Sequence, residues 1–173
     1  MKPLALRVSM CLLAVCLAGC GETHDPASVV VGSRAPDFAL EARDGTTLKS
    51  SSLKGDIVVL NFWATYCQPC RSEIPELNQV AASSKAKVVG IALDQGGDEV
   101  IRAFEKDANL KLNYTVLLGD EEVFQRFNGV GIPYTLVLDR SQRIVKIYRG
   151  PVDQETLERD LSAIEERAEL SGR

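Results

Sequence analysis

The sequence predicts an α/β domain with a mixed central sheet flanked by helices. Short apolar runs, which predict buried strands, alternate with longer segments whose apolar residues recur at helical spacing. This alternation predicts parallel crossovers first, whereas the last two apolar runs flank a short turn and predict a terminal hairpin. No internal repeat or low-complexity segment appears, so we expect a single domain.

Turn and capping residues place each element in order. Asp44-Gly45 predicts the turn of an N-terminal hairpin, and Asp120 and Asp153 can cap two of the helices. The expected strands are 57–64, 87–93, 134–138 and 144–148, after a hairpin over 38–48. Helices are expected from Gln68 to about Ser84, and from Asp98, Asp120 and Asp153 onward. The last helix is expected to bury a stripe formed by Leu157, Leu161, Ile164 and Ala168.

Two cysteines, Cys67 and Cys70, carry the most informative signal in the chain. They directly follow an apolar strand and lie at the start of a helix. The N–H groups and positive dipole end of a helix N-terminus favour thiolate over thiol, and the thiolate attacks disulfides. A second cysteine one turn further on can displace the mixed disulfide. The spacing therefore predicts thiol–disulfide exchange, with Cys67 attacking and Cys70 resolving.

Two other uses of such a pair fit the sequence less well. A structural zinc site needs four ligands, but the other cysteines (Cys11, Cys16 and Cys20) and the single histidine, His24, all lie near the N-terminus. A structural disulfide that closes so short a loop gains little entropy. We expect no metal and no other cofactor.

Residues 1–19 resemble a lipoprotein signal peptide. A basic start precedes an apolar run over 8–18 that is too short to span a bilayer. The run ends in Leu17-Ala18-Gly19-Cys20, which resembles the lipobox of bacterial lipoproteins, in which cleavage precedes a lipid-bearing cysteine. An ordinary secretory signal is the alternative. We expect a lipid bilayer anchor at Cys20, a tether over 20–31 and a folded domain over 32–173.

Charge and cysteine content fit an extracytoplasmic location. The net charge of −4 becomes more negative once the basic residues of the leader are removed, which argues against binding to nucleic acid. With Cys20 lipidated, one dithiol remains in a generally oxidising compartment. We therefore expect a membrane-anchored protein on the periplasmic side.

From about Val31 onward, the chain resembles the extracytoplasmic thioredoxin-like proteins of the TlpA/ResA type. The matching segments are G-S-R-A-P-D-F at 32–38, L-K-G at 53–55, N-F-W-A-T-Y-C-Q-P-C-R at 61–71, Glu73, Pro75 and G-I-P-Y-T at 131–135. The resemblance implies a thioredoxin fold with an N-terminal hairpin extension and the activity of a thiol–disulfide oxidoreductase.

The resemblance also implies a substrate groove beside the cysteines. The Ile132–Pro133 bond is expected to be cis and to face the cysteines, where Ile132 offers backbone groups to an extended substrate segment. The groove residues implied in this way are Trp63, Tyr66, Gln68, Pro69, Ile132 and Pro133.

Two positions depart from the thioredoxin pattern. Asn61 replaces the buried aspartate of cytoplasmic thioredoxins, so another group or water must handle the proton. Glu73, in the helix of the cysteines, and Asp94, after the second strand, are candidates for a proton relay, although Asp94 could equally cap its loop. Tyr66 replaces the commoner tryptophan, which changes the rim of the groove but keeps it aromatic.

Two rival functions are open. A thiol peroxidase of the peroxiredoxin-like group shares the opening motif, but it needs a threonine and a proline where this chain has Ala64 and Leu60. A copper-chaperone-like binding module of related fold uses Cys-x-x-x-Cys with a distant histidine, which the expected domain lacks.

The direction of electron flow is suggested by the Gln68-Pro69 dipeptide. It has a rigid proline and lacks the histidine of strong oxidants, so we expect the reducing half of the range from about −270 to about −120 mV. Disulfide-containing extracytoplasmic proteins are the expected substrates, and apocytochrome c, in cytochrome c maturation, is one family-level example. The resemblance implies a membrane thiol–electron transporter as the source of electrons.

Overall fold

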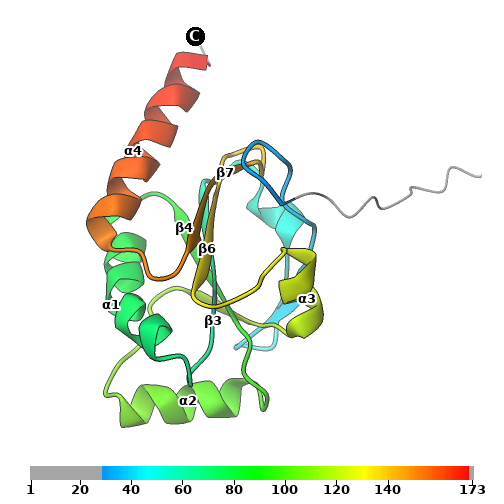
Figure 1. The fold of residues 1–173 in the computed structure, drawn as a ribbon, viewed down its shortest axis with the longest axis vertical. Helices are drawn as coiled ribbons and strands as arrows, with labels where there is room; N and C mark the ends of the chain where they lie inside the picture. The colour runs from blue at the N-terminus through cyan, green and yellow to red at the C-terminus, as the bar shows by residue number, and fades with distance from the viewer. Residues whose placement is uncertain (1–28, 172–173) are drawn as a thin grey trace, which may run out of the picture.

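A mixed seven-stranded sheet forms the centre of the computed structural model, which describes residues 29–171 (Figure 1). The strands are β1 (Ala39–Ala42), β2 (Thr47–Lys49), β3 (Val58–Trp63), β4 (Lys87–Ala92), β5 (Thr115–Leu118), β6 (Tyr134–Leu138) and β7 (Ile144–Arg149). The helices are α1 (Gln68–Ser83), α2 (Asp98–Asp107), α3 (Glu121–Arg126) and α4 (Gln154–Ser171), with a short 3-10 helix η1 (Ser50–Leu53).

The strand directions confirm the predicted parallel crossovers and the terminal hairpin. Across the sheet the order is β2-β1-β5-β4-β3-β6-β7. Strands β3, β4 and β5 run parallel, as crossover connections require, while the β1–β2 and β6–β7 hairpins are antiparallel. The N-terminal hairpin joins the sheet through β1, which pairs with β5. The fold is therefore the expected mixed α/β sheet with a hairpin extension.

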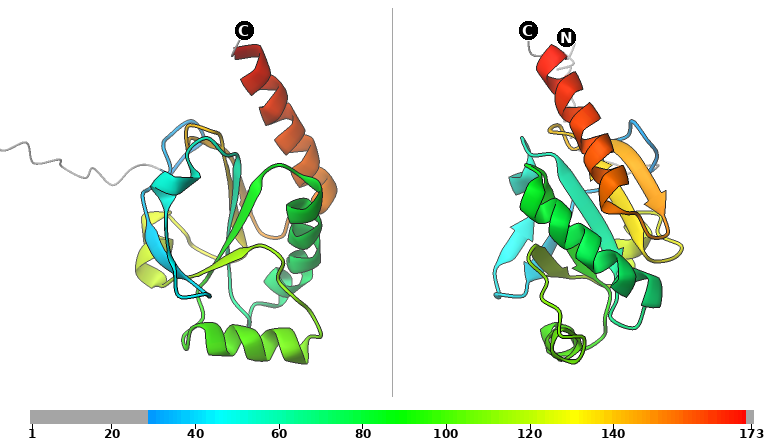
Figure 2. Two further views of the ribbon diagram at one scale, coloured as in Figure 1. Left: turned by 180° about the vertical axis from the view of Figure 1, so that it is seen from behind. Right: turned by 90° about the vertical axis from the view of Figure 1, so that its left-hand side faces the viewer.

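Strand β3 lies at the centre and is buried on both faces. Leu60 and Phe62 point into a cluster with Phe124 of α3, whereas Val59 points into a cluster with α1 and α4. Helices α1 and α4 lie side by side on this second face (Figure 2). Because both faces are covered, the end of β3 is held firmly where the cysteines follow.

Capping residues begin the helices where the sequence predicted. The Asp120 carboxylate accepts a hydrogen bond from the Val123 N–H (2.8 Å), and that of Asp153 accepts one from the Thr156 N–H (2.7 Å). The predicted stripe of α4 is only partly right. Leu157 and Leu161 are buried, but the later stripe residues are half-buried because α4 runs past the edge of the sheet (Figure 1).

One strand of the sheet was missed by the sequence prediction. Strand β5 fills the position between β4 and β1, yet it is only four residues long. A short apolar run without periodicity cannot be assigned to a strand or a helix, and only its two partners in the sheet make it a strand.

The N-terminal predictions lie mostly outside residues 29–171. Cys20, the leader and most of the tether lie outside this range. Val29, which the sequence assigned to the tether, is 4% exposed and packs in the cluster under α3. Within the described range, no helix combines the length and apolar character that a bilayer span requires.

Candidate active site

Cys67 and Cys70 lie where β3 passes into α1, and they form a disulfide with an S–S distance of 2.04 Å. Cys67 is the N-cap residue of α1, and its sulfur accepts a hydrogen bond from the Cys70 N–H (3.2 Å). Cys67 is 8% exposed, whereas Cys70 is 1% exposed. Cys67 is therefore the more accessible residue of the two, and its sulfur lies at the positive end of the helix.

The loop before β6 lies against the cysteines. The Ile132–Pro133 peptide bond is cis, as predicted, and the sulfur of Cys67 lies 3.7 Å from the carbonyl oxygen of Ile132. Around this contact, Tyr66 is 74% exposed and Gln68 and Pro69 are also exposed. These three exposed residues flank Cys67 in the chain, and their part in substrate binding stays a prediction.

Trp63 is not a groove residue, which corrects the sequence prediction. Its side chain is 0% exposed and packs against Phe104 of α2, with ring centroids 6.0 Å apart. Trp63 is the last residue of β3, and its side chain points under α1 and α2 instead of outward. Its position next to the cysteine segment made it look like a groove residue in the sequence.

Glu73 is a buried carboxyl group on the inner face of α1, 2% exposed. Its two oxygens accept hydrogen bonds from the Val152 N–H and from Nδ2 of Asn61, both at 3.0 Å. Burial raises the pKa of Glu73 to about 7, in spite of the two hydrogen bonds, which lower it. A carboxyl group with this pKa can take up or release a proton near neutral pH.

The partner that completes this polar cluster was missed in the sequence. Nδ2 of Asn61 also donates to the hydroxyl of Thr135 (2.8 Å), and both side chains are buried. Asn61 pairs with Thr135 across β3 and β6, although the two residues are far apart in the chain. Only the register of the sheet brings them together, so no local sequence signal could have found the contact.

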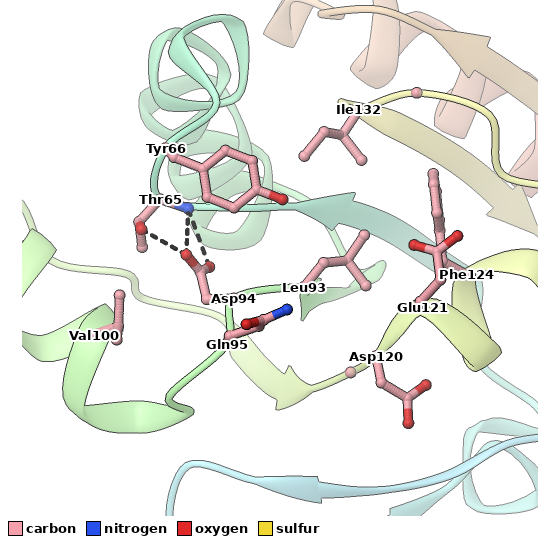
Figure 3. A pocket seen from close by; sticks show the side chains of 12 residues that line it. Thr65, Tyr66, Leu93, Asp94, Gln95, Val100, Asp120, Glu121, Phe124 and Ile132 are labelled. Atoms are coloured by element: carbon pink, nitrogen blue, oxygen red, sulfur yellow. Dashed lines mark hydrogen bonds between the residues drawn. The ribbon is translucent and has the colours of Figure 1, made fainter.

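Asp94 holds the segment that precedes Cys67. Its carboxylate accepts hydrogen bonds from the Thr65 N–H (3.0 and 3.1 Å) and from the Thr65 hydroxyl (2.6 Å), as Figure 3 shows. This is the loop-capping arrangement that the sequence left open beside a proton relay.

A cleft of about 790 Å³ opens beside the cysteines. Tyr66 and Ile132 line it on the side of Cys67, and Asp120 lies across from them (Figure 3). The full lining is Thr65, Tyr66, Leu93, Asp94, Gln95, Val100, Gly119, Asp120, Glu121, Phe124, Gly131 and Ile132. Its charged residues are all acidic, and none of the three forms an ion pair within the described part of the chain.

Comparison with known proteins gives a consistent result. Residues 31–163 match the AhpC/TSA family. The thiol-disulfide oxidoreductase ResA of Geobacillus kaustophilus (strain HTA426) is 29% identical over 170 residues, which cover 94% of this chain and 98% of that protein. ResA of Bacillus thuringiensis (strain Al Hakam) is 31% identical over 143 residues, covering 81% of this chain and 82% of that protein.

Solved structures give the same picture. A crystal structure described as a putative thiol:disulfide interchange protein DsbE from Chlorobium tepidum matches with a TM-score of 0.71 and 31% identity, covering 79% of this chain and 99% of that chain. The chain therefore belongs to the AhpC/TSA family, and it is a thiol–disulfide oxidoreductase of the ResA/DsbE type whose CxxC motif is formed by Cys67 and Cys70.

Proposed function

We propose that this protein is a membrane-tethered reductant of disulfides in extracytoplasmic proteins. The observation that supports the proposal most is the contrast between the two sulfurs. Cys67 is partly accessible at a helix N-terminus, beside a free cleft, whereas Cys70 is covered. One accessible sulfur and one covered sulfur suit the two successive steps of exchange.

The reaction uses the two thiols alone. The Cys67 thiolate attacks one sulfur of the substrate disulfide, and the other substrate sulfur leaves as a thiolate that takes up a proton. Cys70 then loses its proton and attacks the Cys67 sulfur, which breaks the mixed disulfide and releases the second substrate thiolate. The substrate gains two electrons, and the protein ends with the Cys67–Cys70 disulfide.

Glu73 is the group we assign to the proton of Cys70. It lies three residues after Cys70 on the same helix, is buried with it, and has a pKa of about 7. A base with a pKa near the working pH is well matched to proton transfer. Asp94 is the weaker candidate, because both of its oxygens already hold the Thr65 segment.

The direction and the location come from the sequence. The Gln68-Pro69 dipeptide favours a reductant, and a reductant in an oxidising compartment must be recharged by a membrane thiol–electron transporter. The lipobox-like end of the leader supports anchoring through Cys20. Apocytochrome c thiols are one compatible substrate, as are other secreted disulfide proteins.

The cleft supports a preference for basic substrate segments. Its walls combine apolar side chains such as Leu93 and Phe124 with the carboxylates of Asp94, Asp120 and Glu121. A lysine or arginine could lay its methylene stem on the apolar wall and place its charge near the acids. The cleft reaches Tyr66 and Ile132, beside Cys67. Such a basic residue would therefore lie close to the substrate cysteine that Cys67 attacks.

The peroxidase alternative is weakened by the local contacts of Thr65. A peroxidase needs a threonine hydroxyl free to orient peroxide at the thiolate. In this chain Ala64 stands at the position of that threonine, and the hydroxyl of the neighbouring Thr65 donates to Asp94 at 2.6 Å. The copper-binding alternative receives no support from a third ligand, since residues 29–171 contain no cluster of three His, Cys, Asp or Glu side chains suited to a metal.

Trapping tests the proposal in the full-length, membrane-targeted protein. Cys70→Ser should accumulate mixed disulfides between Cys67 and extracytoplasmic proteins, and an added reductant should cleave them. Cys67→Ser is the matched control and should trap nothing. Partners joined through residue 70 in that control would overturn the assignment of the attacking sulfur.

Fractionation tests the anchor in the same cells. Cys20→Ala should release the domain from the membrane while its exchange activity with a soluble disulfide stays intact. Unchanged membrane association together with an unmodified mass at Cys20 would contradict the lipid anchor.

A further inference from the structure

Two buried polar groups of the interior have no hydrogen-bond partner within the described residues. They are the indole Nε1 of Trp63 and the hydroxyl of Tyr114. Leaving a buried donor unpaired costs about 1–3 kcal/mol, so such groups usually bind water or a side chain. Neither belongs to the exchange reaction itself. Trp63 belongs to the apolar cluster that contains Cys67 and Cys70, and Tyr114 packs against this cluster.

Gly90 brings these two groups together. A Cβ atom at this position of β4 would lie 2.9 Å from the ring of Tyr114 and 3.0 Å from Nε1 of Trp63. Any larger residue would push the two rings apart. The absence of a side chain at Gly90 therefore lets the ring edge of Tyr114 and the indole N–H of Trp63 approach the same point of β4.

The register of the sheet places this point beside Glu73. Gly90 is the direct neighbour of Asn61 in the parallel β3–β4 pair, so their side-chain positions share one face. Asn61 on that face donates to Glu73 (3.0 Å), and Trp63, two residues further along β3, points the same way. The charges of Glu73 and Glu105 reach the hydroxyl of Tyr114, because they add to burial in raising the pKa of Tyr114.

Glu73 has capacity for a further hydrogen bond. Each of its oxygens accepts one bond, whereas an ionised carboxylate can accept about four. Trp63 can only donate, and the hydroxyl of Tyr114 can do both. A single water with three polar partners would satisfy all of these groups and is typical of buried waters.

We propose that a buried water joins Trp63 Nε1 and the Tyr114 hydroxyl to the Glu73 carboxylate, and that Tyr114 is thereby a positioning residue for the Glu73 proton. Donors that reach the carboxylate through this water stabilise its ionised form. Glu105 is the other charged group that acts on Tyr114, and it pairs with Arg43 at 2.8 Å. In spite of burial, the pairing lowers the pKa of Glu105 and raises that of Arg43, so neither changes charge near neutral pH. Arg43, Asp44 and Arg102 line the surface pocket beside Tyr114. The water site stands by itself, and its effect on catalysis rests on the proposed role of Glu73.

The test uses the oxidised protein, in which neither cysteine titrates. The chain has one tryptophan, so a single indole N–H resonance reports on the site. That resonance should show magnetisation transfer from a long-lived water and should titrate together with the side-chain carbon of Glu73. Tyr114→Phe should raise the pKa of Glu73 by about 0.7 unit, which corresponds to the loss of roughly 1 kcal/mol of hydrogen bonding.

Tyr148→Phe is the matched control. Its hydroxyl bonds to Asp160 of α4 and not to Glu73, so the change should leave the Glu73 titration as it is. An indole resonance with no water contact, or a Glu73 titration that Tyr114→Phe leaves unchanged, would overturn the proposal. A Tyr114→Phe protein that is more stable and has an unchanged Glu73 titration would also contradict the proposal. That result would mean that the hydroxyl of Tyr114 is unpaired in solution.

A separate measurement distinguishes this site from the proposed function. The pH profile of mixed-disulfide resolution should change in Glu73→Gln, and Tyr114→Phe should add nothing further in that background. If the water and the titration shift are found but Glu73→Gln leaves the profile unchanged, the site stands and the relay role of Glu73 fails.

Discussion

The sulfur of Cys67 lies 3.7 Å from the backbone carbonyl oxygen of Ile132. This contact joins the two segments that the sequence singled out, although 65 positions separate them. An extended substrate segment that pairs with the backbone of Ile132 would have its cysteine next to the Cys67 sulfur. Substrate binding and attack would then meet at one point, next to the cleft lined by Tyr66 and Ile132.

The first prediction concerns the stability conferred by Glu73. Its pKa is about 7 in the folded protein against an ordinary value of 4.5, so the folded state holds a proton that the unfolded chain releases between these pH values. Stability should therefore fall as the pH rises through this window, by about 3 kcal/mol in total. Urea unfolding at a series of pH values measures this loss.

Glu73→Gln should abolish the fall in stability with rising pH. The new amide NH₂ group will face the N–H of Val152 or Nδ2 of Asn61, which are donors, so the variant should be less stable at pH 5. Glu99→Gln, on the exposed side of α2, is the control and should keep the slope. A slope that survives in Glu73→Gln would assign the pH dependence to another group.

The second prediction separates Trp63 from Tyr66. Trp63→Phe should lower the free energy of unfolding by about 1–3 kcal/mol because it leaves a cavity in the core. It should leave the KM for a protein disulfide unchanged. Tyr66→Ala should do the reverse, with a higher KM and unchanged stability, since this side chain is 74% exposed. Denaturation and steady-state kinetics on both variants decide the matter, and a raised KM in Trp63→Phe alone would restore Trp63 to the groove.

The third prediction tests the charge of the cleft. Glu121→Gln should slow the reduction of peptide disulfides flanked by arginine about two- to fivefold at low salt, the size expected for one exposed ion pair. Peptides flanked by aspartate should not be slowed. Glu122→Gln, the exposed neighbour outside the cleft, is the control. Equal slowing by Glu121→Gln and Glu122→Gln would argue against a subsite for basic residues. Equal slowing of the arginine-flanked and aspartate-flanked peptides would argue against it as well.

Most of the fold and the reactive pair could be predicted because their signals are local. Helix caps such as Asp120, the strand before Cys67 and the CxxC spacing each lie within a few residues of sequence. The predictions that failed all depend on contacts between residues that are far apart in the sequence. Trp63 alternates with Phe62 on a strand buried on both faces, so its pattern could not separate the core from the groove.

The polar cluster around Glu73 was only half predictable for the same reason. Its position on the cysteine helix marked Glu73 as a candidate, but Thr135 and Gly90 join it only through pairing of β3 with β6 and β4. Strand register is set by the whole sheet, and a single sequence does not reveal it.

The reduction potential of the Cys67–Cys70 pair tests the central claim most directly. The oxidised domain is equilibrated with defined ratios of reduced and oxidised glutathione, and the dithiol fraction is measured by alkylation and mass. We predict a value in the reducing half of the range, more negative than about −195 mV. A value close to about −120 mV, that of the strongest oxidants, would contradict a reductase and leave an oxidase or an isomerase.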